Sequence, residues 1–255
     1  MIDTTRLADE LISEFSKAKT ISRDQIKAFY KSHISDLKES SFSWMVYHLC
    51  KDKVIQRVGY NTFQLYNNET KRLVFNPTPS DNALNLIELI SNKFPLLTFS
   101  VWEMWMLNEF VNHQFEKNVI FIDIEKRYEE SVFDEIKTEL DYPILLKPDE
   151  KELDLYSGHI TGVIFSLTQE APKNSSQKTL APLEKILVDI FANKEIKNIL
   201  SFGEYTNIFE SAFSKYIIDE KSMFRYARRR RKEQEILEFL KNKTSVQLLT
   251  EVFSD

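Results

Sequence analysis

The sequence predicts an α+β protein of two domains, a winged helix-turn-helix followed by an α/β domain with a mixed sheet and a helical C-terminal part. Three observations predict this fold. Residues 4–66 show three helical patterns and then two short alternating strands. The middle of the chain alternates strand and helix patterns, and from Pro182 onward every segment has a helical pattern. We therefore expect a winged helix-turn-helix domain at residues 1–70 and an α/β domain at residues 80–255.

The three N-terminal helices are predicted by apolar residues at helical spacing. Ser22 is the expected N-cap of the second helix, and Ser40 or Ser41 is that of the third, because a hydroxyl can accept a hydrogen bond from a free first-turn amide. The apolar positions are Leu7, Leu11, Ile12 and Phe15 in the first helix, Ile26, Phe29 and Tyr30 in the second, and Phe42, Met45, Val46 and Leu49 in the third.

A β-hairpin is predicted directly after these helices. Residues 54–58 and 62–66 have strand patterns and flank a turn that begins at Gly59. A hairpin in this place would be the wing of the domain. A polar and then proline-containing stretch follows, so we expect the domain boundary within residues 67–80.

The rest of the chain is predicted to alternate between strands and helices and then to become helical. Residues 170–179 are polar and contain proline and serine, which indicates a loop. Strands are expected at residues 96–101, 119–124, 144–146 and 162–167, and helices at residues 81–93, 103–113, 130–139, 182–193, 203–216 and 220–241.

The composition is that of a globular protein in a reducing compartment. Hydrophobic residues make up 42% and charged residues 29%, which is enough for a core. Cys50 is the only cysteine, so the chain cannot form an internal disulfide. Neither a signal peptide nor an apolar run near the ~18 residues of a membrane span is present. We expect a cytoplasmic protein without membrane contact.

The patterns of enzymes and metal sites are weak in this sequence. Its four histidines are widely spaced, and no phosphate-binding or dinucleotide-binding glycine motif occurs. Asp123 and Glu125, at the end of a buried strand, superficially resemble the acids of a restriction-like nuclease, but no lysine stands two places after either. We expect no catalytic residues, no cofactor and no metal. A nuclease-like enzyme remains the alternative.

The predicted third helix and wing carry the residues expected to bind DNA. Basic residues at the end of this helix and on the wing suit phosphate contacts. The net charge of the whole chain is -5, so such contacts must come from a local basic patch. The face lacks Arg, Asn and Gln, which read bases best, so a protein-interaction module without DNA binding is a second alternative. The expected DNA-binding residues are Lys38, Ser41, Ser43, Trp44, Tyr47, His48, Lys51, Lys53, Arg57 and Tyr60.

A second basic run lies near the C-terminus, at residues 225–232. On a single helix, one side would carry Arg225, Arg228, Arg229 and Lys232. This side could bind nucleic acid or an acidic partner. The alternative is a solvated helix face that is balanced by Glu233, Glu235 and Glu238.

Six segments distributed over nearly the whole chain match the pattern of one protein family. These segments are Phe42–Leu49, Trp102–Gln114, Val119–Lys126, Gln169–Pro172, Leu180–Asp189 and Tyr226–Arg230. The most distinctive parts are the Leu-Glu-Lys-Ile-Leu-Val-Asp helix and the Tyr-Ala-x-Arg-Arg run. Together the segments resemble the AbiE-type (type IV) antitoxins and related winged-helix transcriptional regulators of bacteria, especially an uncharacterised branch.

The resemblance implies a non-enzymatic transcriptional regulator and antitoxin. In that family the N-terminal domain binds promoter DNA and represses the operon, and the C-terminal domain is tied to neutralising a nucleotidyltransferase-like toxin encoded next door. The oligomeric state stays open. This chain departs from the family at the wing tip, where Gly59-Tyr60-Asn61 stands in place of Gly-Arg-Gly.

Overall fold

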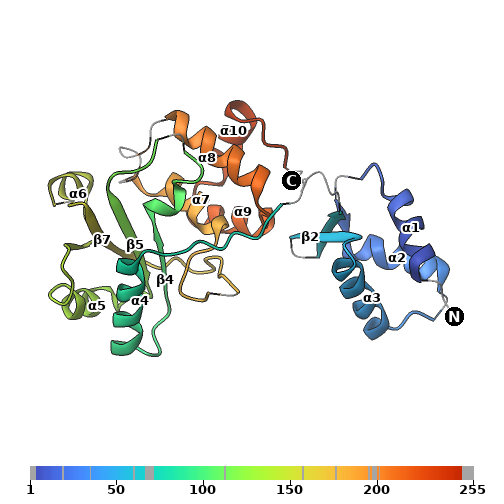
Figure 1. Cartoon of the computed structure of the whole chain (residues 1–255), viewed down its shortest axis with the longest axis horizontal. Coiled ribbons are helices and arrows are strands. Elements are labelled where there is room, and N and C mark those ends of the chain that lie inside the picture. Colours follow the sequence, from blue (N-terminus) through green and yellow to red (C-terminus); the bar gives the residue numbers. More distant parts are fainter. Residues whose placement is uncertain are drawn as a thin grey trace. The chain divides into compact units, whose positions relative to one another are not determined.

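The fold is α+β, and its strands form two separate sheets, one antiparallel and one mixed (Figure 1). The predicted α+β class and mixed sheet are therefore confirmed. The computed structural model describes residues 4–18, 20–34, 36–59, 61–66, 72–111, 113–156, 158–175, 177–194, 196, 200 and 202–248.

The chain divides into two compact units. The N-terminal unit comprises Met1–Leu73, Ile217–Ser222 and Gln247–Asp255, and the C-terminal unit comprises Val74–Tyr216 and Met223–Val246. Among the described helices, none has the length and apolar character that crossing a membrane requires.

The N-terminal unit contains three helices and a small antiparallel sheet, so the three helices and the hairpin predicted from the sequence are confirmed. The first strand was not predicted, because two residues are too few to show an alternating pattern. The strand order is β1-β3-β2, with Ile21 opposite Phe63. The elements are α1 (Thr4–Glu14), β1 (Ile21–Ser22), α2 (Arg23–His33), α3 (Glu39–Lys51), β2 (Ile55–Gly59) and β3 (Thr62–Leu65).

The beginnings of α2 and α3 differ in how well they were predicted. Ser22 caps α2 as expected: its hydroxyl accepts a hydrogen bond from the Gln25 amide at 3.1 Å, and the Gln25 side chain accepts one from the Ser22 amide at 2.7 Å. The prediction that Ser40 or Ser41 caps α3 is wrong. This helix begins at Glu39, whose carboxylate suits the positive end of the helix dipole.

The core of the N-terminal unit is formed by the apolar faces of its three helices against the sheet. Ile12, which the helical pattern included, is instead 40% exposed on α1. The fully buried side chains are Leu11, Ile21, Ile26, Phe42 and Phe63.

The C-terminal unit is built on a four-stranded sheet with the order β4-β5-β7-β6. β4 is antiparallel to β5, whereas β5, β7 and β6 are parallel to one another. All four strands overlap the segments predicted from the sequence. Their bounds are Phe99–Glu103 for β4, Asn118–Ile124 for β5, Ile144–Leu146 for β6 and Ile160–Ser166 for β7.

The helices after residue 74 match the sequence prediction in part. Most of the expected helices are present, and α6 is an addition. They are α4 (Asp81–Lys93), the 3-10 helix η1 (Met104–Leu107), α5 (Glu129–Ile136), α6 (Glu150–Tyr156), α7 (Leu183–Ala192), α8 (Phe202–Lys215), α9 (Glu220–Arg229) and α10 (Glu233–Lys243).

The helix predicted at residues 103–113 is wrong. Glu103 ends β4, and only Met104–Leu107 forms a short 3-10 helix. The buried Glu103 carboxylate accepts hydrogen bonds from the amide and hydroxyl of Ser80, each at 2.7 Å, and from the Asn118 side chain at 2.6 Å. These bonds hold residue 103 in the sheet, so the helical spacing of the aromatic residues that follow is overruled.

The prediction of a single helix at residues 220–241 is also wrong, because the helix is interrupted between α9 and α10. Arg231 has a φ of 56°, in the left-handed region that interrupts a right-handed helix. Arg230 turns toward the interior to donate hydrogen bonds to Asp189 and Asn193. The residues expected on one helical side, from Arg225 to Lys232, therefore do not share a continuous helix.

A buried ionic cluster, here called the Lys185 cluster, joins three elements of the C-terminal unit. Lys185 of α7 is fully buried, and its ammonium group contacts Asp123 of β5 and, at 2.5 Å, Asp189 of α7. Burial alone would lower the pKa of Lys185, but the two carboxylates raise it above its usual value. The lysine is therefore charged and fixes α7 to the sheet.

Asp189 extends the cluster to the C-terminal helices. Its second oxygen accepts hydrogen bonds from the Tyr226 hydroxyl at 2.8 Å and from the Arg230 guanidinium at 2.6 Å. Arg230 also donates to the Asn193 side chain at 2.5 Å. Two buried acids thus face two basic groups, so the charges in the cluster are balanced.

Another buried carboxylate, that of Glu129, lies where α5 begins. Glu129 accepts hydrogen bonds from the Ser166 hydroxyl and, at 3.1 Å, from the Lys147 ammonium group. Burial opposes ionisation, but the bonds from Ser166, the Glu129 backbone amide and Lys147 outweigh it and lower the pKa of Glu129 to about 2. The ionised carboxylate ties α5 to the chain beyond β6 and to the end of β7.

The Lys185 cluster leads to a prediction about stability. Replacing Lys185 with methionine leaves the Asp123 and Asp189 carboxylates buried without their shared partner, so we expect the free energy of unfolding to fall by about 3–5 kcal/mol. Urea unfolding followed by tryptophan fluorescence measures this loss. The control is Lys241→Met on the exposed face of α10, which should change stability by less than about 0.5 kcal/mol. Equal effects of the two substitutions would contradict the role of the cluster.

Glu129 leads to a prediction about pH. The pKa of Glu129 in the folded protein is about 2, below its usual value of 4.5. The ionised carboxylate therefore stabilises the fold fully at pH values above 4.5. This stabilisation is lost as the pH falls from 4.5 toward 2. Glu129→Gln should therefore lower the free energy of unfolding most near neutral pH, and its deficit should shrink on acidification. Urea titrations of both proteins across this range test the prediction. A deficit that does not change with pH would refute it.

Candidate nucleic-acid interface

The exposed side of α3 is dominated by aromatic residues. Trp44, Tyr47, His48 and Lys51 follow one another at helical spacing, which puts them on one side of the helix. Trp44 is 56% exposed and Tyr47 is 61% exposed. Large aromatic side chains with this much exposure on a short helix are unusual for a surface that has no partner.

The His48 ring on this side contacts the rings of both Trp44 and Tyr47. The Trp44 and His48 ring centroids lie 3.9 Å apart with planes tilted by 41°, and Tyr47 meets His48 edge to face at 5.4 Å. His48 also lies 3.8 Å from Asp52 one turn later. The rings therefore form a preorganised patch, here called the α3 aromatic patch, which can stack on planar groups or contact a thymine methyl group.

Around the beginning of α3, the charges are partly compensated. Glu39 pairs with Lys27 at 2.6 Å and with Arg23 at 2.9 Å, and the hydrogen bonds from Lys27 and Arg23 lower the pKa of Glu39. Arg23 also donates to the Ser43 hydroxyl at 2.9 Å, so that predicted residue is engaged within the unit. The predicted residues Lys38 and Ser41 are exposed.

The other end of α3 and the hairpin carry basic side chains with no acidic partner. Lys51, Lys53 and Arg57 are all exposed, and within the described part of the chain none forms an ion pair. The Arg57 guanidinium lies 5.4 Å from the centre of the Phe63 ring, which orients it. The remaining predicted residue, Tyr60, lies outside the described residues.

The segment that forms this surface differs in charge from the chain as a whole. Residues 4–66 contain ten Lys and Arg against seven Asp and Glu, a net charge of +3, whereas the whole chain carries -5. The excess of basic residues therefore lies in this segment and not in the rest of the chain. Such an excess attracts phosphates despite the overall acidity.

An apolar groove lies beside the α3 aromatic patch. It has a volume of about 380 Å³ and lies between α1, α2 and α3. Leu7 and Ile12 of α1 and Trp44, Met45 and His48 of α3 contribute to its walls. A groove of this kind can accept an apolar side chain from a partner protein.

The basic run at residues 225–232 is largely paired with acids of the same chain. Arg228 donates two hydrogen bonds to Glu233, at 2.6 and 2.7 Å, and Lys232 pairs with Glu235. Arg229 pairs with Glu170. The sequence could indicate the partners close in the chain, but not Glu170, which comes from a distant loop. Arg225 is exposed on α9.

The acids considered for a nuclease do not share an open site. Asp123 is buried in the Lys185 cluster, whereas the exposed Glu125 accepts a hydrogen bond from the Thr98 amide at 3.3 Å. Among the residues that the structure describes, no three His, Cys, Asp or Glu side chains gather in a way that could hold a metal ion.

Comparison with known proteins gives a family without an assigned activity. No curated protein matches the chain. A family described only as being of unknown function, DUF6577, matches residues 41–246, which run from the first turn of α3 to beyond the end of α10. This match covers most of the sequence, and the chain belongs to the family of unknown function DUF6577.

Proposed function

We propose that this protein is a non-enzymatic regulator that binds duplex DNA through its N-terminal unit. In this proposal the unit is a winged helix-turn-helix domain, with α2 and α3 as the helix pair and the β2–β3 hairpin as the wing. One observation carries the proposal: the exposed side of α3 is flanked by Lys51, Lys53 and Arg57, which have no acidic partner among the described residues. Unpaired basic groups around an exposed helix suit a major groove lined with phosphates.

The side chains of the interface divide into two groups by their chemistry. The basic residues at the end of α3 and on the hairpin would contact phosphates, which gives affinity that does not depend on sequence. Trp44 and Tyr47 would face the bases, where they offer apolar contact and stacking but few hydrogen bonds. The proposed regulator therefore derives most of its affinity from charge, and its DNA binding should depend strongly on salt.

A second part of the proposal concerns the C-terminal unit. The resemblance to AbiE-type antitoxins supports a role in opposing a nucleotidyltransferase-like toxin from a neighbouring gene. In this role the unit acts as a binding partner and not as a catalyst. Promoter binding by the N-terminal unit would then adjust the supply of toxin and antitoxin together.

The apolar groove beside Trp44 favours one other function for the N-terminal unit, a protein-docking module. In that case Trp44 and Ile12 would contact a protein partner. Lys51, Lys53 and Arg57 distinguish the two functions. DNA binding requires these basic residues for phosphate contacts, whereas docking of a protein partner in the groove does not require them.

The DNA-binding proposal predicts a specific loss of affinity on removing these charges. The triple variant Lys51→Gln, Lys53→Gln, Arg57→Gln should bind duplex DNA on the order of 10- to 100-fold more weakly. The slope of log affinity against log salt should fall by roughly 3, because about three phosphate contacts are lost. Fluorescence anisotropy with the DNA upstream of the gene, at several salt concentrations, measures both quantities.

A matched variant controls for the loss of charge. Lys17→Gln, Lys151→Gln, Lys241→Gln removes the same number of charges from exposed residues that belong neither to α3 nor to the hairpin. It should bind DNA with nearly the wild-type affinity and salt slope. Equal weakening by both triple variants, or no binding of the wild type at low salt, would refute the proposed interface.

The antitoxin part of the proposal predicts rescue of growth. Expression of a nucleotidyltransferase-like protein encoded beside this gene should stop bacterial growth, and co-expression of the full chain should restore it. The triple variant lacking Lys51, Lys53 and Arg57 should restore growth equally well from an independent promoter, because its C-terminal unit is unchanged. Failure of the wild-type chain to restore growth would refute this part and leave the DNA-binding part standing.

A further inference from the structure

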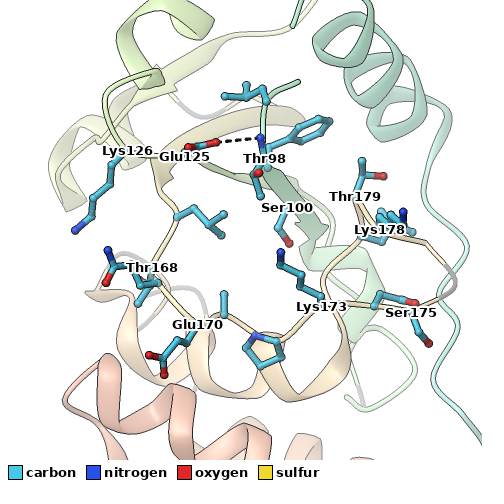
Figure 2. Close-up of a pocket in the computed structure, with 18 residues that line it drawn as sticks. Thr98, Ser100, Glu125, Lys126, Thr168, Glu170, Lys173, Ser175, Lys178 and Thr179 are labelled. Atoms are coloured by element: carbon cyan, nitrogen blue, oxygen red, sulfur yellow. Dashed lines mark hydrogen bonds between the residues drawn. The ribbon is translucent and has the colours of Figure 1, made fainter. Parts of the chain in front are cut away.

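A large pocket of the C-terminal unit lies at one end of the mixed sheet (Figure 2). Its volume is about 880 Å³. It is lined by Glu125 and Lys126, directly after β5, by Leu167 and Thr168, directly after β7, and by Thr98, just before β4. Since β5 and β7 are parallel, their carboxyl ends both open onto the pocket. This is where open α/β sheets ordinarily bind their ligands.

The loop between β7 and α7 closes the pocket, and both of its ends are attached to the sheet. At the first end, the Leu167 amide donates to the Ile124 carbonyl oxygen at 2.7 Å. At the second, the Val101 amide donates to the Thr179 carbonyl oxygen at 2.7 Å, and the Ala181 amide donates to Val101 at 2.9 Å. The frame of the pocket is therefore held by backbone hydrogen bonds.

The two carboxylates of the pocket lining are both engaged. Glu170 points away from the centre of the pocket (Figure 2) and pairs with Arg229 of α9, whose hydrogen bond lowers the pKa of Glu170. Glu125 accepts the hydrogen bond from the Thr98 amide that Figure 2 shows as a dashed line. The charge of Glu170 is therefore balanced by Arg229, whereas Glu125 keeps its negative charge, which the three lysines of the lining outnumber.

Four side-chain donors of the pocket, in contrast, have no acceptor within the described residues. Figure 2 shows the Lys173 side chain reaching toward Ser100 of β4, and Lys126 and Lys178 on opposite rims. In the part of the chain that the structure describes, none of these three ammonium groups has a hydrogen bond or an ion pair, and the Ser100 hydroxyl has none either. Ser100 is only 9% exposed, so its hydroxyl lies at the inner end of the pocket.

The remaining walls offer apolar surface. Their side chains are mainly aliphatic, because Phe99 is only 6% exposed and, as the residue before Ser100 in β4, has its ring on the opposite face of the strand. The apolar lining residues are Leu97, Phe99, Leu167, Ala171, Pro172 and Leu180.

We propose that this pocket binds a small phosphate ester of about the size of a mononucleotide. The phosphate group lies between the Lys173 ammonium group and the Ser100 hydroxyl, and the organic part lies against the apolar walls. A phosphate monoester carries nearly two negative charges at neutral pH and has several acceptor oxygens. It therefore supplies both the hydrogen-bond acceptors and the negative charge that the unpaired lysines and the Ser100 hydroxyl do not find within the pocket. The volume falls within the range of about 300–1,000 Å³ that is common for small-molecule sites.

The three lysines have different roles in this site. Lys173 contacts the phosphate group directly. Lys126 and Lys178, on the rims, raise the electrostatic potential at the entrance and draw the anion in, an effect that salt screens. The proposal concerns the C-terminal unit alone and does not depend on DNA binding by α3.

Isothermal titration calorimetry of the full-length chain with AMP, GMP, CMP and UMP tests the site. At least one nucleotide should bind with a Kd of roughly 1 mM or tighter, and its nucleoside, which lacks the phosphate, should bind at least about tenfold more weakly. Lys173→Gln should weaken binding by about tenfold or more, and Ser100→Ala should weaken it by a smaller factor. The double variant Lys126→Gln, Lys178→Gln should mainly reduce the dependence of the affinity on salt.

Lys151→Gln on α6 is the matched control, because this exposed lysine does not line the pocket and the charge change is the same. It should bind the nucleotide as the wild type does. Circular dichroism of Lys173→Gln, whose side chain is exposed, checks that the fold is intact. The proposal is overturned if no nucleotide binds, if the nucleosides bind equally well, or if Lys151→Gln and Lys173→Gln have the same effect. A separate anisotropy titration with DNA reports on α3, so failure of one site is distinguishable from failure of the other.

Discussion

The arrangement of the C-terminal unit depends on one buried charge, the Lys185 ammonium group. A buried ion pair adds little to the free energy of unfolding, because desolvation offsets much of its attraction, but separating the charges is costly. Any arrangement in which α7 moves away from Asp123 leaves a charged group without a partner. The same argument reaches the C-terminal helices, since Asp189 binds Tyr226 and Arg230 as well as Lys185. The cluster therefore specifies one packing of sheet and helices.

Local patterns predicted the N-terminal unit well, and tertiary contacts explain what they missed. The helix pattern and the Ser22 capping box are properties of neighbouring residues, so they can be read from the sequence. The beginning of α3 at Glu39 could not be predicted from neighbouring residues, because Glu39 forms ion pairs with Lys27 and Arg23 of another helix. In the C-terminal unit, Asp149 and Glu152 cap the beginning of α6 reciprocally, at 2.8 and 2.9 Å, and this pair is a local sequence pattern of the same kind as the Ser22 capping box.

In the C-terminal unit the sequence predicted the strands but not the surroundings of the candidate sites. Glu103 stays in the sheet and Arg230 ends α9 because each has partners far away in the chain. The exposed residues of α3 were predicted from helical spacing alone, since they belong to one element. The pocket that contains Lys173 and Ser100 was not predicted from the sequence. Its walls come from three separate parts of the chain, which are brought together only by the topology of the sheet.

The unequal distribution of charge has a consequence for how the protein would meet a polyanion. Residues 4–66 carry +3 in a chain of -5, so the remaining residues together carry -8. A nucleic acid is attracted by the first segment and repelled by the rest, which limits how much of the protein can lie along it. For a DNA-binding protein, this repulsion weakens non-specific binding to DNA. In the proposed DNA-binding role, the protein would dissociate quickly from most sites, and the short-range contacts of α3 would decide where it stays.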